Sequence, residues 1–185
     1  LELLRELAEG QARLDGEALA DMVPVAVRMM DNVTDVSRFP LPEQAAEARA
    51  KRRIGLGVTG LADALIMCRV RYGAQEAVKL TETWLGAIRR AAYLASAELA
   101  AEKGAFPLFD ADDFLDSGHA RTLDDDVRDA IRSSGIRNGC LTSIAPTGTI
   151  SLFADNVSSG IEPVFSPTYM RNVLMPDGSR QSQEV

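Results

Sequence analysis

The chain has 185 residues, of which 46% are hydrophobic and 25% are charged, a composition typical of a globular protein with one sizeable core. Its 20 Lys and Arg against 27 Asp and Glu give a formal charge of −7, which argues against a nucleic-acid partner and against an anionic membrane. No apolar run approaches the roughly 20 residues that span a bilayer, and no signal-peptide pattern is present, so we expect a cytoplasmic protein. Two cysteines are too few for a disulfide framework, and a single histidine argues against a zinc site.

Helical spacing of apolar residues dominates the chain. It predicts helices at 1–14, 17–33, 43–50, 60–68, 74–103 and from 124 to about 134. Pro24 lies inside the second helix and is expected to kink it or to delay its start, whereas Gly104 is well placed to end the long fifth helix. The proline-rich connector at 39–42 is expected to be extended, and the basic cluster at 49–53 is interpreted as a solvated helix end.

Short strands are predicted at about 54–58, 140–145 and 168–175. The first two are each followed by a turn and a helix, which favours an α/β fold, although these strands are too few to close a barrel or a sheet alone. The acidic stretch 110–129 is expected at the surface, and 156–167 is expected to be loop. Residues 1–185 are predicted to form a single unit, with 176–185 as a flexible tail.

Gly55, Gly57 and Gly60 match the G-x-G-x-x-G pattern of dinucleotide-binding turns. In such proteins a long apolar strand precedes the glycines, and an acidic residue follows a second strand about 20 residues later. Here basic residues precede the glycines, and Glu76 stands at the start of a predicted helix. We therefore favour close backbone packing at a strand-to-helix turn over a nicotinamide site.

Pro146, Thr147, Gly148, Thr149 and Ile150 join the second predicted strand to a short predicted helix; we call them the 146–150 turn. A helix start offers unpaired N–H groups and a partial positive charge, and threonine hydroxyls add further donors. The turn is therefore a candidate phosphate-binding site. The residues alone are equally compatible with Thr147 as a plain helix N-cap.

No catalytic or metal-binding role is predicted for the cysteines or the histidine. Cys68 lies among apolar residues and Cys140 begins a predicted strand, so both are interpreted as buried small hydrophobic residues. His119 is expected at the surface without a partner. The aspartates of the acidic stretch lack the regular spacing of a calcium-binding loop.

Several segments together resemble the large subunit of ribonucleotide reductases. They are Arg28-Met-Met-Asp-Asn-Val33 through Asp35, Phe39-Pro-Leu-Pro42, Arg52-Arg-Ile-Gly-Leu-Gly-Val-Thr-Gly-Leu-Ala-Asp-Ala64, Gly135-Ile-Arg-Asn138, Ile144-Ala-Pro-Thr-Gly-Thr-Ile-Ser151 and Ser159-Gly-Ile-Glu-Pro163. Their order and spacing match the family from about residue 17 to 175. The segment 141–165 is most similar to the adenosylcobalamin-dependent members.

The resemblance implies a helix-rich piece of a ten-stranded α/β barrel, from an enzyme that reduces ribonucleoside di- or triphosphates to 2′-deoxyribonucleotides through a thiyl radical. It implies adenosylcobalamin as the cofactor of the complete enzyme. The implied partners are the ribonucleotide substrate, the rest of the barrel and a thioredoxin-like reductant, and a homo-oligomer is compatible with it. Pro146, Thr147, Gly148, Thr149 and Ile150 would then form the substrate-phosphate loop.

This sequence also departs from the family pattern. The family's radical cysteine lies in an Asn-x-Cys-x-Glu motif that nothing here matches, and both it and the first reducing cysteine are expected before Leu1. We therefore expect the chain alone to be inactive. Two alternatives stay open. A helical scaffold module would bind through 74–103 and have no anion affinity at 146–151, whereas a dinucleotide-binding protein would need an ordered βαβ unit around residue 54.

Overall fold

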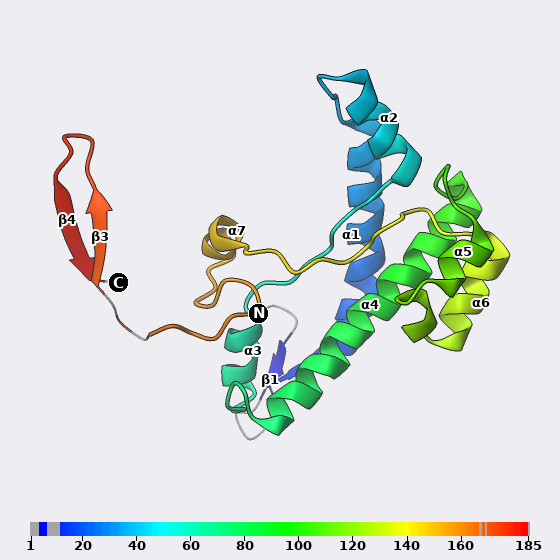
Figure 1. Cartoon of the computed structure of the whole chain (residues 1–185). Helices are drawn as coiled ribbons and strands as arrows, with labels where there is room; N and C mark the ends of the chain where they lie inside the picture. Colours follow the sequence, from blue (N-terminus) through cyan, green and yellow to red (C-terminus); the bar gives the residue numbers. More distant parts are fainter. Residues whose placement is uncertain (1–3, 7–11, 167, 169, 185) are drawn as a thin grey trace.

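The computed structural model describes residues 4–6, 12–166, 168 and 170–184 (Figure 1). Its helices are α1 (Gly16–Val36), α2 (Pro42–Lys51), α3 (Leu61–Met67), α4 (Gln75–Lys103), α5 (Ala111–Asp116), the 3-10 turn η1 (Ala120–Thr122), α6 (Asp125–Ser134) and α7 (Gly148–Phe153). Its strands are β1 (Leu4–Glu6), β2 (Ala12–Leu14), β3 (Met170–Leu174) and β4 (Arg180–Glu184). The helices predicted from residue 17 onward are therefore confirmed, with ends that differ by a few residues.

The main core lies around α4, which packs between α1 and α6 (Figure 1). Ala92 and Ala95 of α4 are buried, and their small side chains let the neighbouring helices approach closely. Val27 of α1 and Ile131 of α6 are fully buried in the same cluster. Burial of each such branched side chain stabilises the fold by about 1.5–3 kcal/mol. Gly104 ends α4 with a φ of 86°, as its position predicts.

The N-terminal segment differs from the expectation. A helix is predicted at 1–14, but β1 pairs with β2 in an antiparallel hairpin; residues 1–3 and 7–11 lie outside the described residues. A short leucine-rich helix is marginal in isolation, and Leu14 packs against the main core from the strand. Asp15 caps α1 by accepting a hydrogen bond from the Ala18 amide at 3.2 Å. The helix thus begins at Gly16 and continues through Pro24, so the delayed start is wrong.

A buried polar cluster connects α1, α4 and the segments that follow α2 and α6. Asp31 is 0% exposed, and its Oδ1 accepts hydrogen bonds from Arg52 Nη2 at 2.7 Å and from Asn138 Nδ2 at 3.0 Å. Its Oδ2 accepts one from Arg137 Nε at 3.3 Å. Asn138 is also linked to Ser96 of α4 by two hydrogen bonds. We call these five residues the Asp31 cluster.

The interpretation of the basic cluster 49–53 as a solvated helix end is wrong for Arg52. It follows α2 in the left-handed conformation and is only 4% exposed. Besides Asp31, it binds Asp35 one helical turn further along α1, with Nη1 2.7 Å from Oδ1. The charge pattern at 49–53 does not reveal this arrangement, because both partners lie on a different helix.

The predicted strands 54–58 and 140–145 are confirmed only in part. Leu56 and Thr142 form a single parallel bridge, and the Leu56 amide donates to the Leu141 carbonyl at 2.7 Å. Within the described part of the chain the sheets are two-stranded, and no barrel closes. A parallel pair with no further neighbour lacks partners to extend its ladder. The observed fold is therefore a helix-rich α/β segment.

The C-terminal segment forms a hairpin. The strand predicted at 168–175 is confirmed as β3, and β4 pairs with it antiparallel in the stretch 176–185, which was expected to be a flexible tail. Asp177-Gly178 lies at the turn, with Gly178 at a φ of 82°, a frequent hairpin signal. The described side chains of β4 are exposed, and for this reason its sequence shows no alternation of apolar and polar residues.

The acidic stretch 110–129 folds into α5, η1 and the start of α6, with most of its aspartates exposed as predicted. Arg90 of α4 binds Asp124 and Asp126 there, and the hydrogen bond from Arg90 lowers the pKa of Asp126 to about 2. These ion pairs lie in solvent and mark the outer face of the α4–α6 contact. Within the described ranges, no helix combines the length and apolarity needed to cross a bilayer.

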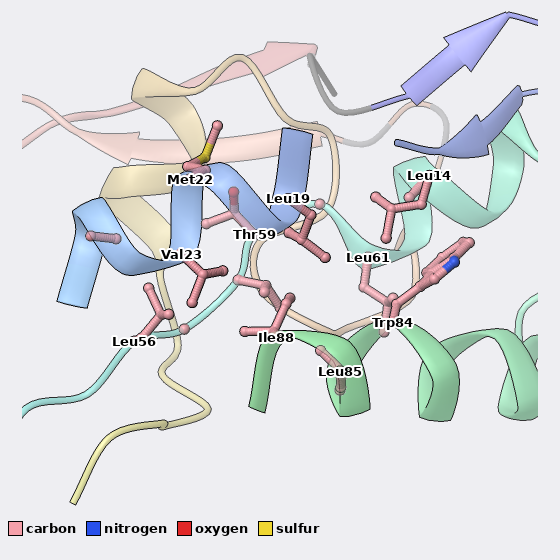
Figure 2. A pocket seen from close by; sticks show the side chains of 15 residues that line it. Leu14, Leu19, Met22, Val23, Leu56, Thr59, Leu61, Trp84, Leu85 and Ile88 are labelled. Atoms are coloured by element: carbon pink, nitrogen blue, oxygen red, sulfur yellow. The ribbon is translucent and has the colours of Figure 1, made fainter. Parts of the chain in front are cut away.

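An apolar cavity of about 320 Å³ opens between α1, α4 and the segment 56–61 (Figure 2). Met22, Leu56, Trp84 and Ile88 are among the side chains that line it (Figure 2). On α7 and the following loop, large apolar side chains are also exposed, Phe153 at 94%. Apolar surface of this kind favours contact with another chain or segment.

We predict that the isolated 185-residue chain self-associates or packs loosely, because this apolar surface and the unpaired strand edges stay exposed. Light scattering should show species larger than a monomer, and a dye that binds apolar surface should fluoresce. A monodisperse monomer with sharp cooperative melting and no dye binding would contradict this prediction.

Candidate functional site

The 146–150 turn leads directly into α7, which begins at Gly148, one residue earlier than predicted. Thr147 occupies the N-cap position in a left-handed conformation, with φ 50° and ψ 18°. A β-branched residue rarely adopts this conformation, and such strain of about 1–3 kcal/mol is concentrated at functional sites. Its side chain makes no capping hydrogen bond, and its Oγ1 is buried without a partner among the described residues. Thr147 is therefore not an ordinary N-cap.

The five predicted site residues adjoin one another in the chain, and Thr147 is the half-buried one among them. Pro146, Gly148, Thr149 and Ile150 are exposed. The first amides of a helix have no acceptor within it, so those of Gly148, Thr149 and Ile150 remain available to a ligand. A Cβ placed on Gly148 would meet nothing within 4 Å, so the space beside the helix start is open. This arrangement can present N–H and hydroxyl donors to an anion.

The loop 156–160 packs against the 146–150 turn. The Asn156 amide donates to the Ser151 carbonyl at 3.0 Å, and Ser151 Oγ donates to the Gly148 carbonyl at 2.9 Å. Gly160 approaches so closely that a Cβ on it would lie 3.2 Å from Thr147 Oγ1. Backbone N–H groups of Glu162 and Gly160 lower the pKa of the Glu162 carboxyl, which accepts from Gly160. The loop thus contacts the 146–150 turn at Thr147 and contacts α7 at Ser151.

The loop is in turn attached to α3. The amides of Gly60 and Leu61 donate to the carbonyls of Ser159 and Gly160 at 3.2 and 3.1 Å. The Asp63 carboxylate accepts from two amides of the same loop. Sequence reasoning did not single out Asp63 or Gly160 as site residues. Both lie in segments that resemble the reductase family, and this resemblance is the signal that could have identified them.

The glycine motif has the structural role that the sequence favours. A Cβ on Gly55 would lie 2.8 Å from Ser143 Oγ, and one on Gly57 would lie 3.0 Å from the Ser143 carbonyl oxygen. Gly60 precedes α3 with a φ of 71°. Close packing at a strand-to-helix turn is confirmed. The single parallel bridge at Leu56 is not the βαβ unit that a dinucleotide site requires.

The cysteines and the histidine lie apart from the turn in sequence. Cys68 is half-buried in a small second core, and burial raises the pKa of its thiol. Cys140 is exposed, so its interpretation as a buried residue is wrong; the single bridge leaves its side chain uncovered. His119 is exposed but has a partner, since its ring lies 5.6 Å from that of Tyr93. The described residues contain no group of three or more His, Cys, Asp or Glu placed to hold a metal ion.

Helices packed around α4, with a single parallel bridge and an exposed turn at the start of α7, define a helix-rich α/β segment. The chain belongs to the ribonucleotide reductase family: the family model described as "Ribonucleotide reductase, barrel domain" matches residues 2–183.

Several reductases are similar to this chain. A vitamin B12-dependent ribonucleoside-diphosphate reductase of Mycobacterium tuberculosis (strain CDC 1551 / Oshkosh) is 44% identical over 174 residues, which cover 94% of this chain and 22% of the relative. A protein of the same name from Thermoplasma acidophilum is 34% identical over 94% of this chain and 20% of its own length. The ribonucleoside-diphosphate reductase large subunit of vaccinia virus is 31% identical over 88% of this chain and 22% of its own length. The chain thus spans about a fifth of the length of these relatives.

Proposed function

We propose that this chain is the part of a ribonucleotide reductase that binds the phosphates of the substrate. The complete enzyme would reduce a ribonucleotide to a 2′-deoxyribonucleotide through a thiyl radical. In the net reaction the 2′-hydroxyl leaves as water, and two cysteine thiols supply two electrons and become a disulfide. The observation that carries the assignment is the left-handed Thr147 at the open start of α7, whose buried hydroxyl has no partner among the described residues.

The role of the 146–150 turn follows from its donors. The amides of Gly148, Thr149 and Ile150 would donate to phosphate oxygens, and the Thr147 and Thr149 hydroxyls would add to them. Each well-formed hydrogen bond to a charged group contributes about 1.5–3 kcal/mol. Pro146 fixes the direction in which the chain enters the turn. Because Gly148 has no side chain, a phosphate can approach the backbone closely.

Adenosylcobalamin is the cofactor that we propose for the complete enzyme, because the relatives at 44% and 34% identity are named as vitamin B12-dependent. When bound, it supplies the radical. The described residues of this chain do not fit it: the apolar cavity between α1 and α4 holds only about 320 Å³, and the one histidine lies on the surface beside Tyr93. The cofactor site therefore belongs to other parts of the enzyme, and the role of this chain lies in substrate binding.

The partners follow from the same proposal. The rest of the barrel would cover the apolar cavity and the exposed face of α7, and a thioredoxin-like protein would reduce the disulfide formed in each cycle. We propose a cytoplasmic enzyme. The names of the relatives favour a diphosphate substrate. Assays of the complete enzyme with the di- and the triphosphate of one ribonucleoside would decide between the two.

We predict that the isolated 185-residue chain forms no deoxyribonucleotide when it is given adenosylcobalamin, a ribonucleoside diphosphate and a dithiol. The physical reason is that neither Cys68 nor Cys140 lies in an Asn-x-Cys-x-Glu context, so the chain has no thiol suited to abstract the 3′-hydrogen. Chromatography of the nucleotide products measures the outcome. The complete enzyme under the same conditions is the positive control, and substrate-dependent product from the isolated chain would refute the assignment.

A further inference from the structure

The carboxylate of Asp63 holds the loop 156–160 at two adjacent points. Asp63 lies in the first turn of α3 and is 8% exposed. Its Oδ1 accepts from the Val157 amide at 3.0 Å, and its Oδ2 accepts from the Ser158 amide at 2.8 Å. Both carboxylate oxygens are thus bonded to neighbouring amides of one loop. Hydrogen bonds to a carboxylate are shorter and stronger than those between neutral groups.

Three further hydrogen bonds align the same loop with the start of α3. Two are backbone bonds, from the Gly60 and Leu61 amides to the Ser159 and Gly160 carbonyls. The third runs from Asn156 Nδ2 to Thr59 Oγ1 at 2.6 Å. In Figure 1 the segment after α7 returns to the start of α3, as these bonds require. Unlike the backbone groups, the Asp63 carboxylate can be removed by a substitution, so the effect of its two hydrogen bonds can be measured.

The loop held by Asp63 is the surface against which the 146–150 turn rests. A Cβ on Gly160 would lie 3.0 Å from the Ala145 carbonyl oxygen and 3.2 Å from Thr147 Oγ1. The Asn156 amide bonds to the Ser151 carbonyl of α7. A displacement of the loop would therefore move both Ala145, where the chain enters the turn, and α7, which follows the turn.

We propose that Asp63 is a positioning residue for substrate phosphate: it holds the loop 156–160, and through that loop it holds Thr147 and the first amides of α7 in their ligand-binding geometry. The inference rests on the proposed function of the 146–150 turn. Asp63 itself touches no substrate. Its effect should therefore appear in substrate affinity and in the order of the turn.

The test is Asp63→Asn in the complete reductase. Asparagine keeps the shape but faces one of the two amides with its NH₂ group, so one hydrogen bond is replaced by a donor–donor contact. We expect KM for the ribonucleoside diphosphate to rise about tenfold, with kcat changed by no more than about twofold. Hydrogen exchange should become faster in peptides covering 145–160 and stay unchanged in those covering α6. The matched control is Asp126→Asn, which makes the same change in the first turn of α6, and its KM should equal that of the wild type.

Gly160→Ala tests the same contact from the other side and serves if Asp63→Asn does not fold. Its added methyl group would press on the Ala145 carbonyl and Thr147 Oγ1, so KM should again rise while α6 exchange stays normal. Faster exchange at 145–160 with an unchanged KM would overturn the positioning role, as would a loss confined to kcat. If Gly148→Val raises KM and Asp63→Asn does not, the positioning role fails and the phosphate assignment stands. If neither raises KM, the proposed function fails and the positioning role fails with it.

Discussion

Gly148→Val in the complete reductase is expected to raise KM for the substrate by roughly ten- to a hundredfold while the enzyme stays folded. The loss of one charge-assisted hydrogen bond to phosphate, about 1.5–3 kcal/mol, gives this range at about 1.4 kcal/mol per factor of ten. The fold should tolerate the change, since a Cβ at Gly148 meets nothing within 4 Å and its φ is not in the left-handed region. The branched side chain would instead occupy the space in front of the amides that we assign to phosphate.

Gly16→Val is the matched control for this experiment. Gly16 is also the first residue of a helix, and a Cβ there likewise meets nothing within 4 Å. We expect this variant to keep the KM of the wild type, as measured by steady-state kinetics over a range of substrate concentrations. If a folded Gly148→Val enzyme also kept normal substrate affinity, the phosphate assignment would be lost and the turn would be only a helix start.

Asp31→Asn should produce the largest loss of stability. Asp31 is the single carboxylate that faces both Arg52 and Arg137 at its two oxygens, in a site with 0% exposure. Removal of its charge leaves Arg137 without a carboxylate partner among the described residues and Arg52 with Asp35 alone, and breaking a buried ion pair in this way costs about 3–5 kcal/mol. Urea denaturation of the complete reductase and of the variant should show this difference in the unfolding of the domain that contains the chain.

The control is again Asp126→Asn, whose ion pair with Arg90 lies in solvent, so the free energy of unfolding should barely change. The Asp31 effect should also depend on pH. Burial raises the pKa of the Asp31 carboxyl, but the hydrogen bond and charge of Arg52 and the charge of Arg137 more than offset it, and the pKa lies below 3.8. A lowered folded-state pKa stabilises the fold fully above the unfolded value. The advantage of the wild type over Asp31→Asn should therefore shrink below about pH 4. An Asp31→Asn variant as stable as the control at neutral pH would contradict the cluster's role.

Part of the site could be predicted because its signals are local. The 146–150 turn was predicted from a run of small, hydroxyl and glycine residues before a short apolar helix, and the structure shows α7 beginning within it. The conformation of Thr147 was not predictable in this way. Its left-handed backbone and orphaned hydroxyl depend on the approach of Gly160, a residue 13 positions further along the chain.

The sequence predicted α1, α2, α3, α4 and α6 and the end of α4 at Gly104, because apolar periodicity and capping residues act within a few turns of the same segment. It did not predict the short helix α5 in the acidic stretch. Local sequence patterns did not predict the hairpin of β1 and β2, the burial of Arg52 or the pairing of β4. β4 pairs with the adjacent β3, but its residues show no apolar alternation that would predict a strand. The other two cases depend on partners distant in sequence, Leu14 on the main core and Arg52 on Asp31 and Asp35. The contact of Asp63 with Val157 and Ser158 is of the same kind, since 94 and 95 residues separate the groups that meet. Local sequence patterns cannot predict such contacts, because the contacts stabilise the protein only after the fold has brought the partners together.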